Sequence, residues 1–285
     1  MTRKSLFHFS LVGLLWGIPY LLMKVAVEDF PPAAVVAGRT LIGASILIPI
    51  AIYRKKFGGA VLGFKYVAFY ALMEMIGPWI LITTAEQKIN SGLAGLLVST
   101  VPIFATIITS LRGDHSVWQF KRLLGIVVGF IGLILVVGIE SLSGNSDPLS
   151  IAMVIVASMG YAYAVIMVTS NLPLVDGIAI NGLAMAITTV FWAPVAIAQW
   201  PSSISMNSAL SLIALGIFST ALAFILFFKV MAEIGPARSS LVTYLNTAIA
   251  VLLGVIILRE PLTVGIIVGL PLVLVGSYLA SKKTA

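Results

Sequence analysis

The chain has 285 residues, of which 60% are hydrophobic and 9% are charged, and its formal net charge is +7. A water-soluble domain of this length needs far more polar surface around its core, so the composition excludes a soluble globular protein and indicates a membrane protein. The basic residues form no aromatic-interleaved patch of the kind that binds nucleic acids. The chain has no cysteine, which excludes disulfides and thiolate metal sites.

Ten long apolar runs follow one another along the chain, separated by short segments rich in Gly, Pro and charged residues. The backbone must satisfy its hydrogen bonds internally in lipid, and the runs lack the alternation of a β-barrel, so each predicts a transmembrane helix. The basic N-terminus resembles the start of a signal peptide, but no clear cleavage site follows, and we interpret the first run as a retained helix. The predicted spans are 6–26, 32–52, 65–84, 90–110, 119–139, 149–169, 178–199, 208–228, 236–257 and 263–281.

Lysine and arginine gather at alternate ends of these spans, and this bias predicts the topology. With the N-terminus in the cytoplasm, thirteen basic residues fall on the cytoplasmic side and two, Lys88 and Arg259, fall outside. The thirteen are Arg3, Lys4, Arg54, Lys55, Lys56, Lys65, Arg112, Lys121, Arg122, Lys229, Arg238, Lys282 and Lys283. The bias predicts an even number of helices in an inner (plasma) membrane, with both termini cytoplasmic.

Features of the first half recur in the second half in the same order. The matched pairs are Trp16-Gly17 before Tyr20 with Met159-Gly160 before Tyr163, Ala85-Glu86 with Ala232-Glu233, and Gly125 and Gly132 with Gly269 and Gly276. Five helices per half is an odd number, so the second half must enter the membrane from the opposite side. The sequence therefore predicts an all-α bundle of two inverted five-helix repeats, residues 1–142 and 148–285, with a binding site near the midplane.

Small residues four positions apart predict where helices approach closely. Such pairs occur at Gly13/Gly17, Gly125/Gly129 and Gly265/Gly269. The last two pairs lie in the fifth and tenth predicted helices, which indicates that these helices pack either against each other or across a homodimer.

Glu74 lies near the middle of the predicted span 65–84. A charge at the bilayer centre costs about 2.5–3.5 kcal/mol even on lenient insertion scales, so this side chain should face the bundle interior or water. It could bind a proton or a cationic substrate group, or it could form a structural ion pair with Arg39 or Lys24. Pro78 lacks the N–H that would bond the carbonyl of Glu74, which predicts a local break in the helix.

Two basic residues also lie within predicted spans. Lys24 lies near the outer end of the first span, where its ammonium group can reach the membrane surface. Arg39 lies about two turns into the second span. Either side chain could bind a substrate carboxylate or pair with Glu28 or Asp29, and for Lys24 we favour the ion pair.

Aromatic and amide side chains complete the predicted cavity. Tyrosine and asparagine inside a membrane need hydrogen-bond partners, which a polar cavity supplies. Trp118, Trp192 and Trp200 lie near span ends and are predicted to be interface anchors. The predicted substrate- or proton-binding residues are Glu74, Trp16, Tyr20, Trp79, Arg39, Tyr163, Tyr244 and Asn246, with Tyr161 beside them.

Enzyme and metal signatures are missing from the sequence. The chain contains no HExxH, GxSxG, Walker or GxGxxG motif, and His8 and His115 lie far apart in end segments. We expect no catalytic residues, no cofactor and no metal site.

At these residues the chain resembles the drug/metabolite transporter (DMT) superfamily, specifically EamA-type permeases. The resemblance covers nearly the whole length. It rests on Trp16-Gly17 with Lys24, Pro32 with Arg39, the small-residue stretch into Pro102, and Glu260 followed by Gly269 and Gly276. It implies that helices 1, 3, 4, 6, 8 and 9 surround a central cavity, with helices 5 and 10 behind them. Thr247, where members often carry proline, and Glu74 depart from the family pattern.

The function expected from these features is secondary active transport. The favoured hypothesis is an exporter of a small polar metabolite, such as an amino acid, that works by alternating access and could be coupled to protons through Glu74. The alternatives are a permease for lipophilic cations or drugs and, in another class, a non-transporting membrane sensor or assembly partner. The expected partners are a small-molecule substrate and the lipid bilayer, with a homodimer as an option and no nucleic acid.

Overall fold

The computed structural model describes residues 3–113, 119–142, 147–235, 239 and 241–281. The predictions that concern Trp118, His115, Arg238, Lys282 and Lys283 fall outside these residues. Within the described part the regular elements are all helices.

The first half of the chain contains five predicted spans, three of them made of one helix and two of consecutive pieces. Its elements are α1 (Arg3–Ala26), α2 (Pro32–Tyr53), α3 (Phe57–Leu62), α4 (Phe64–Ala71), the π-helix η1 (Leu72–Ile76), α5 (Gly77–Ala85), α6 (Ser91–Val98), α7 (Val101–Leu111) and α8 (Phe120–Leu142).

The second half follows the same order. Its elements are α9 (Pro148–Asn171), α10 (Gly177–Ala198), α11 (Met206–Ala214), the π-helix η3 (Leu215–Leu222), α12 (Ala223–Ile234), α14 (Val242–Ile256) and α15 (Val264–Ser281). Asp147 and Asp176 cap the first helices of this half, because their carboxylates accept backbone N–H groups of Ser150 and of Ile178 and Ala179.

Seven helical segments among the described residues are long and apolar enough to cross a membrane. They are Arg3–Ala26, Pro32–Tyr53, Phe64–Ala85, Ser91–Leu111, Pro148–Asn171, Gly177–Ala198 and Met206–Ile234. Shorter apolar helices follow at Val242–Ile256 and Val264–Leu279. The protein is therefore a multi-pass membrane helix bundle, and the number ten stays a prediction.

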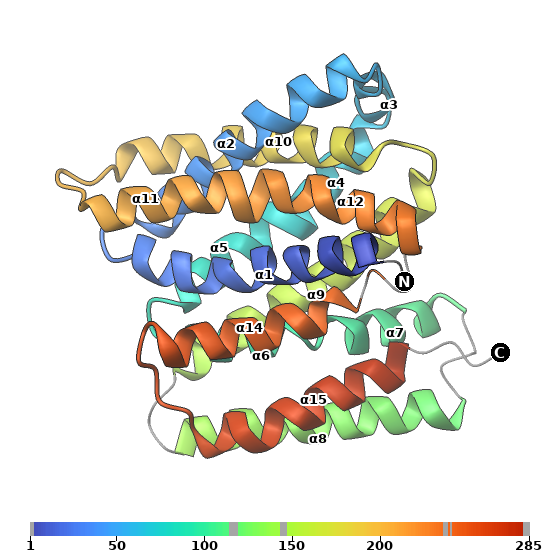
Figure 1. Cartoon of the computed structure of the whole chain (residues 1–285), viewed down its shortest axis with the longest axis vertical. Helices are drawn as coiled ribbons and strands as arrows, with labels where there is room; N and C mark the ends of the chain where they lie inside the picture. Colours follow the sequence, from blue (N-terminus) through green and yellow to red (C-terminus); the bar gives the residue numbers. More distant parts are fainter. Residues whose placement is uncertain (1–2, 114–118, 143–146, 236–238, 240, 282–285) are drawn as a thin grey trace.

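The helices lie side by side in a bundle, and α1 begins at the same end of it as α15 finishes (Figure 1). α8 packs against α15 at one extreme of the long axis, while α2 packs against α10 toward the other. α1 lies between these two pairs and contacts α14, α11 and α12. The sequence left two partners open for the predicted fifth and tenth helices, and within this chain they pack against each other.

Glycine makes the close contact between α8 and α15. A Cβ atom on Gly276 would meet the backbone nitrogen and Cα of Gly129, and one on Gly132 would lie 2.8 Å from the Cβ of Leu272. The backbones of the two helices therefore approach more closely than larger residues would allow. Gly13 and Gly17 play the same part on α1, where they face Leu245 and Ile249 of α14.

The helix that carries Glu74 changes its winding at that residue. Leu72–Ile76 form a π-helix, in which the N–H of Gly77 bonds the carbonyl of Leu72, and α5 follows with Pro78 in its first turn. The predicted break beside Glu74 is confirmed.

The carbonyl of Ile76 accepts a hydrogen bond of 3.1 Å from the indole N–H of Trp192. Trp192 was predicted to be an interface anchor. Its indole N–H is bonded to η1 instead of to the membrane surface, so that prediction does not describe its polar contact.

A second break separates α6 from α7 at Ser99 and Thr100, just before Pro102. Pro102 has no N–H, so the ladder of backbone bonds cannot continue across it. Side chains from elsewhere meet the carbonyls at the break. Ser277 of α15 donates to the carbonyl of Ser99 at 2.8 Å. The hydroxyl of Ser158 of α9, which also bonds the carbonyl of Val154 at 2.9 Å, lies 3.3 Å from the carbonyl oxygen of Leu97. These bonds tie the broken helix to the second half of the chain.

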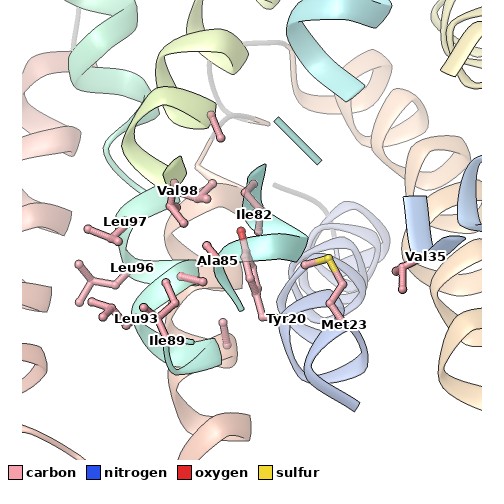
Figure 2. Close-up of a cluster of buried hydrophobic side chains, with 14 of the residues drawn as sticks. Tyr20, Met23, Val35, Ile82, Ala85, Ile89, Leu93, Leu96, Leu97 and Val98 are labelled. Carbon is pink, nitrogen blue, oxygen red and sulfur yellow. The ribbon is translucent and has the colours of Figure 1, made fainter. Parts of the chain in front are cut away.

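The largest buried cluster of apolar side chains surrounds α6, all of whose residues are buried. Figure 2 shows Tyr20 and Met23 of α1 beside Ile82 and Ala85 of α5, with the α6 side chains grouped next to them. The polar residues described below lie at the edge of this cluster, where α1, α2 and α5 meet.

Candidate functional site

Arg39 lies on α2, about two turns after the helix begins, and is only 6% exposed. Its Nε and Nη2 atoms each donate to the hydroxyl oxygen of Thr220 in η3 at 3.2 Å, and Nη1 lies 3.5 Å from the sulfur of Met23. The guanidinium carbon lies 3.9 Å from the centroid of the Trp79 ring, a cation–π contact. This cation thus joins α2 and α5 of the first half to η3 of the second half.

Among the residues that the structure describes, no carboxylate forms an ion pair with Arg39. The ion pairs found within the described ranges are His8–Glu233, Arg54–Asp176 and Lys88–Asp147. The predicted alternative, in which Arg39 pairs with Glu28 or Asp29, is therefore wrong for this conformation. A buried guanidinium whose described direct contacts are a hydroxyl, a thioether and a ring retains donor capacity for an anionic ligand.

Three further polar side chains lie within electrostatic range of Arg39: Tyr20 of α1, Tyr161 of α9 and Glu86 in the α5–α6 connection. Tyr161 also forms a hydrogen bond with Trp79. Two of the predicted site residues, Tyr20 and Trp79, are thereby brought together with Arg39. Tyr161, which the sequence placed beside the predicted set, joins them.

Glu74 lies on η1, one helical segment before Trp79. Its side chain is half-buried, and its Oε2 atom is buried without a hydrogen-bond partner among the described residues. Tyr70 and Tyr161 lie within electrostatic range of the carboxyl group, and the hydroxyl of Tyr70 donates to Asn181 at 3.1 Å. The alternative in which Glu74 forms a structural ion pair with Arg39 or Lys24 is not among the described ion pairs, and a functional role for Glu74 stays a prediction.

Lys24 differs from its prediction as well. Its ammonium group donates to the backbone carbonyls of Glu86 and Ile89, at 2.6 and 3.0 Å, and it pairs with neither Glu28 nor Asp29. The carboxylate of Asp29 instead accepts the backbone N–H of Ser205 at 2.9 Å. Lys24 therefore binds carbonyls of the α5–α6 connection, next to the C-terminal end of α5, where a helix dipole favours a cation.

Glu86 is the charged residue that the sequence did not single out as a site. It is completely buried, at 0% exposure, and both of its carboxyl oxygens lack a hydrogen-bond partner within the described chain. In the sequence it follows the predicted span 65–84 and reads as a connecting residue. Its recurrence in the Ala85-Glu86 and Ala232-Glu233 pairs was the only signal that could have drawn attention to it.

The other predicted residues lie away from Arg39. Trp16 packs on Phe227 and edge-on against Phe224 of α12, with ring centroids 4.6 and 5.6 Å apart. Tyr163 is 38% exposed and packs edge-on against Phe69.

Two predicted residues lie on α14. Asn246 is buried and accepts a hydrogen bond from Thr247 at 3.3 Å, while Tyr244 packs edge-on against Tyr278 of α15. Neither contact joins the Arg39 group, and the predicted set therefore divides into a central part and a peripheral part.

A cleft of about 700 Å³ opens at the end of the bundle where α2 finishes and α10 begins. Arg54, Asp176 and Lys229 line it together with apolar side chains that include Phe228. Arg39 and Arg54 are fifteen residues apart on one helix, about 22 Å along its axis. No group of three or more possible metal ligands occurs among the described residues.

Comparison with known proteins places the chain in a family. The model of the EamA-like transporter family matches residues 3–138 and again residues 148–282. The uncharacterized transporter YoaV of Bacillus subtilis is 27% identical over 277 residues, which cover 94% of this chain and 93% of that protein. The uncharacterized inner membrane transporter YedA of Escherichia coli K12 is 25% identical, with 95% and 90% covered. A solved crystal structure covers 98% of both chains with a TM-score of 0.65 at 15% identity, which shows a shared fold.

The fold and the matches define a multi-pass membrane protein of the transporter class rather than an enzyme. The chain belongs to the EamA-like transporter family of the drug/metabolite transporter superfamily.

Proposed function

We propose that the protein is a secondary transporter that moves a small polar metabolite outward by alternating access, with its substrate site at Arg39. The observation that carries this proposal is the position of Arg39, a buried guanidinium that has no carboxylate partner among the described ion pairs and lies between the two halves of the chain. Secondary transporters bind substrates near the membrane midplane where their repeats meet.

The substrate expected at such a site carries a carboxylate or a similar anionic group. The planar guanidinium presents donors in a fork that matches a carboxylate, and the contact with Trp79 holds its plane in place. Tyr20 and Tyr161 supply aromatic surface and hydroxyl groups nearby. An amino acid or a related metabolite fits this combination of groups.

We further propose ten membrane helices in two inverted repeats, with both termini in the cytoplasm. The family model matches the two halves separately, α1 begins at the end of the bundle at which α15 finishes, and the third span of each half contains a π-helix, η1 or η3. The bounds 1–142 and 148–285 remain those drawn from the sequence. The chain lacks cysteine, so single cysteines in place of the exposed Lys55 and Lys88 test the topology. Labelling of both from the same side would refute it.

Proton coupling is assigned to Glu74. Its Oε2 atom lacks a partner in the described chain, and Tyr161 lies within electrostatic range of both Glu74 and Arg39. Protonation of the carboxyl group would therefore change the charge close to the bound substrate. A carboxylate in a membrane span is costly unless it exchanges a proton or pairs with a cation.

A second candidate function is the efflux of lipophilic cations, which Glu74 would bind directly. The half-buried carboxylate on η1 and the tyrosines near it favour this function. The buried charge of Arg39 disfavours it, because a cation within reach of Tyr161 would also meet the field of the guanidinium.

The test is transport by purified protein in proteoliposomes with an imposed pH gradient. Candidate substrates come from metabolites that accumulate outside cells that overproduce the protein. Glu74→Gln should abolish the response to the pH gradient, whereas the control Glu28→Gln, at an exposed carboxylate in the α1–α2 connection, should retain it. Undiminished pH-driven flux in Glu74→Gln would remove Glu74 as the coupling group. Transport of lipophilic cations in preference to carboxylates would favour the second candidate.

A further inference from the structure

The α5–α6 connection contains a buried carboxyl group that the site at Arg39 does not use. Glu86 is 0% exposed, and neither Oε1 nor Oε2 has a hydrogen-bond partner among the described residues. An ionised carboxylate would need compensating hydrogen bonds or a directly paired cation in such surroundings. The neutral acid has a smaller desolvation penalty, so the geometry favours a protonated Glu86 in this conformation.

Four ionisable or charged side chains interact electrostatically with Glu86: Lys24 and Tyr20 of α1, Arg39 of α2 and Glu260 in the α14–α15 connection. The carboxylate of Glu260 accepts hydrogen bonds from Ser91 and Gly92 at the start of α6.

Two of these neighbours are cations, and both donate their hydrogen bonds elsewhere. Arg39 donates to Thr220, and Lys24 donates to backbone carbonyls. No hydrogen bond in the described chain therefore reaches the carboxyl group of Glu86 itself.

Lys24 is the cation best placed to change partner. Its ammonium group bonds the backbone carbonyl of Glu86 itself, at 2.6 Å, so it is already anchored at the residue whose side chain lacks a partner. The Lys24 side chain has rotatable bonds and three donors. Burial raises the pKa of Glu86 well above its usual range, while the nearby charge of Lys24 acts in the opposite direction.

We propose that Glu86 is a second proton-binding site: it is a carboxylic acid while Lys24 bonds the carbonyls of Glu86 and Ile89, and a carboxylate paired with the Lys24 ammonium after its proton passes to water. The O–H bond is the one covalent bond broken in this step, and the released proton leaves the pair of side chains with no net charge. The role of this site in transport rests on the proposed function, but the proton binding itself does not.

The step has a structural consequence for the end of α1. The two bonds from Lys24 join this end to the α5–α6 connection, and the same end is closely packed, with Ala26 fully buried. Loss of these bonds on deprotonation should loosen the connection and expose Ala26. Proton binding at Glu86 would thus favour the packed arrangement of this end of α1, in which Ala26 is buried.

Cysteine labelling measures this directly, because the chain has no other cysteine. The Ala26→Cys variant in proteoliposomes is treated with a membrane-impermeant maleimide at a series of pH values. The labelling rate, corrected with an exposed Ser203→Cys reference in the α10–α11 connection for the intrinsic pH dependence of the thiol, should rise severalfold from acidic to alkaline pH. Adding Glu86→Gln, which imitates the neutral acid, should keep the rate low throughout, whereas adding Glu74→Gln should leave the rise intact.

Infrared spectroscopy of the same protein observes the proton itself. The carboxylic-acid C=O band of Glu86 should disappear as the pH rises and should be missing from Glu86→Gln at every pH. Lys24→Met removes the cation that stabilises the carboxylate, so the band should persist to higher pH. If Glu86→Gln does not fold, the comparison of the band in wild type and in Lys24→Met tests by itself whether Glu86 binds the proton.

The inference is overturned by a corrected labelling rate that does not change with pH, by a pH response that survives in Glu86→Gln, or by a band unaffected by Lys24→Met. None of these measurements requires transport. A protein that transports nothing under the tested conditions but shows the titration would refute the proposed function and leave the proton site in place.

Discussion

The guanidinium carbon of Arg39 lies 3.9 Å from the centre of the Trp79 ring, while the same guanidinium bonds Thr220 through two nitrogen atoms. The ring and the hydroxyl come from opposite halves of the chain and hold the planar group from two directions. Cation–π contacts of desolvated groups stabilise by about 2 kcal/mol or more. This cation is therefore positioned before any substrate arrives.

Arg39→Lys should weaken substrate binding while leaving the fold intact. Lysine keeps the charge but loses the planar fork of donors that can bond Thr220 and a substrate carboxylate at the same time. The KM for the transported metabolite should therefore rise about tenfold, which corresponds to about 1.4 kcal/mol of binding free energy. The measurement is concentration-dependent transport in proteoliposomes. Arg54→Lys at the exposed end of α2 serves as the control and should leave KM unchanged. An unaltered KM in Arg39→Lys would mean that the substrate binds elsewhere.

Gly276→Val should destabilise the protein strongly. A Cβ atom at this position would meet the backbone of Gly129 on α8, so the two helices must separate. Overpacking of this kind costs about 1–3 kcal/mol, and more where backbone rather than a flexible side chain must move. Thermal unfolding in detergent measures the loss. Gly58→Val, on the short helix α3 with nothing within 4 Å of the added Cβ, controls for the composition change. Equal melting temperatures of the two variants would contradict the close contact.

Glu260→Ala should loosen the start of α6. The carboxylate accepts the backbone N–H groups of Ser91 and Gly92, at 2.8 and 3.1 Å, together with the Ser91 hydroxyl. Loss of a helix N-terminal cap costs about 0.5–2 kcal/mol, and two backbone donors would be left without this acceptor. Hydrogen exchange at these amides should accelerate, and Glu28→Ala should not alter it. Unchanged protection would mean that another group caps the helix.

The contact between Asp29 and Ser205 should respond to acid. Hydrogen bonds from Ser205 and Ser208 lower the pKa of Asp29 below its usual value. A lowered pKa in the folded state means that the carboxylate stabilises the fold above the usual pKa and that this contribution is lost as the pH falls through the lowered one. The protection factor of the Ser205 amide, which lies 2.9 Å from the carboxylate, should therefore fall in acid when exchange is compared with the intrinsic rate at each pH.

The control for this prediction is Asp29→Asn. Asparagine cannot ionise, so the protection factor of the Ser205 amide in the variant should be low already at neutral pH and should show no further acid response of this origin. A wild-type amide whose protection is the same on both sides of the titration would contradict the assignment.

The class of protein followed from the sequence because lipid imposes simple rules. A chain in a bilayer must close its backbone hydrogen bonds within long apolar helices, and the structure places seven such helices at predicted spans. Pro78 predicted the break beside Glu74 for a similarly local reason, because it removes one backbone donor. The small-residue pairs on the fifth and tenth predicted helices also indicated a close contact, which α8 and α15 make.

The partners of the charged side chains were decided only by the tertiary structure. Sequence proximity suggested that Lys24 and Arg39 pair with Glu28 or Asp29, yet their partners are the carbonyls of Glu86 and Ile89 in one case and Thr220 and Trp79 in the other. Glu86 lies just beyond a span, where a carboxylate is ordinarily hydrated, and the packing of neighbouring helices buries it completely. Hydrophobic patterning determines which segments enter the membrane, whereas burial and pairing of one side chain depend on which distant helices meet around it.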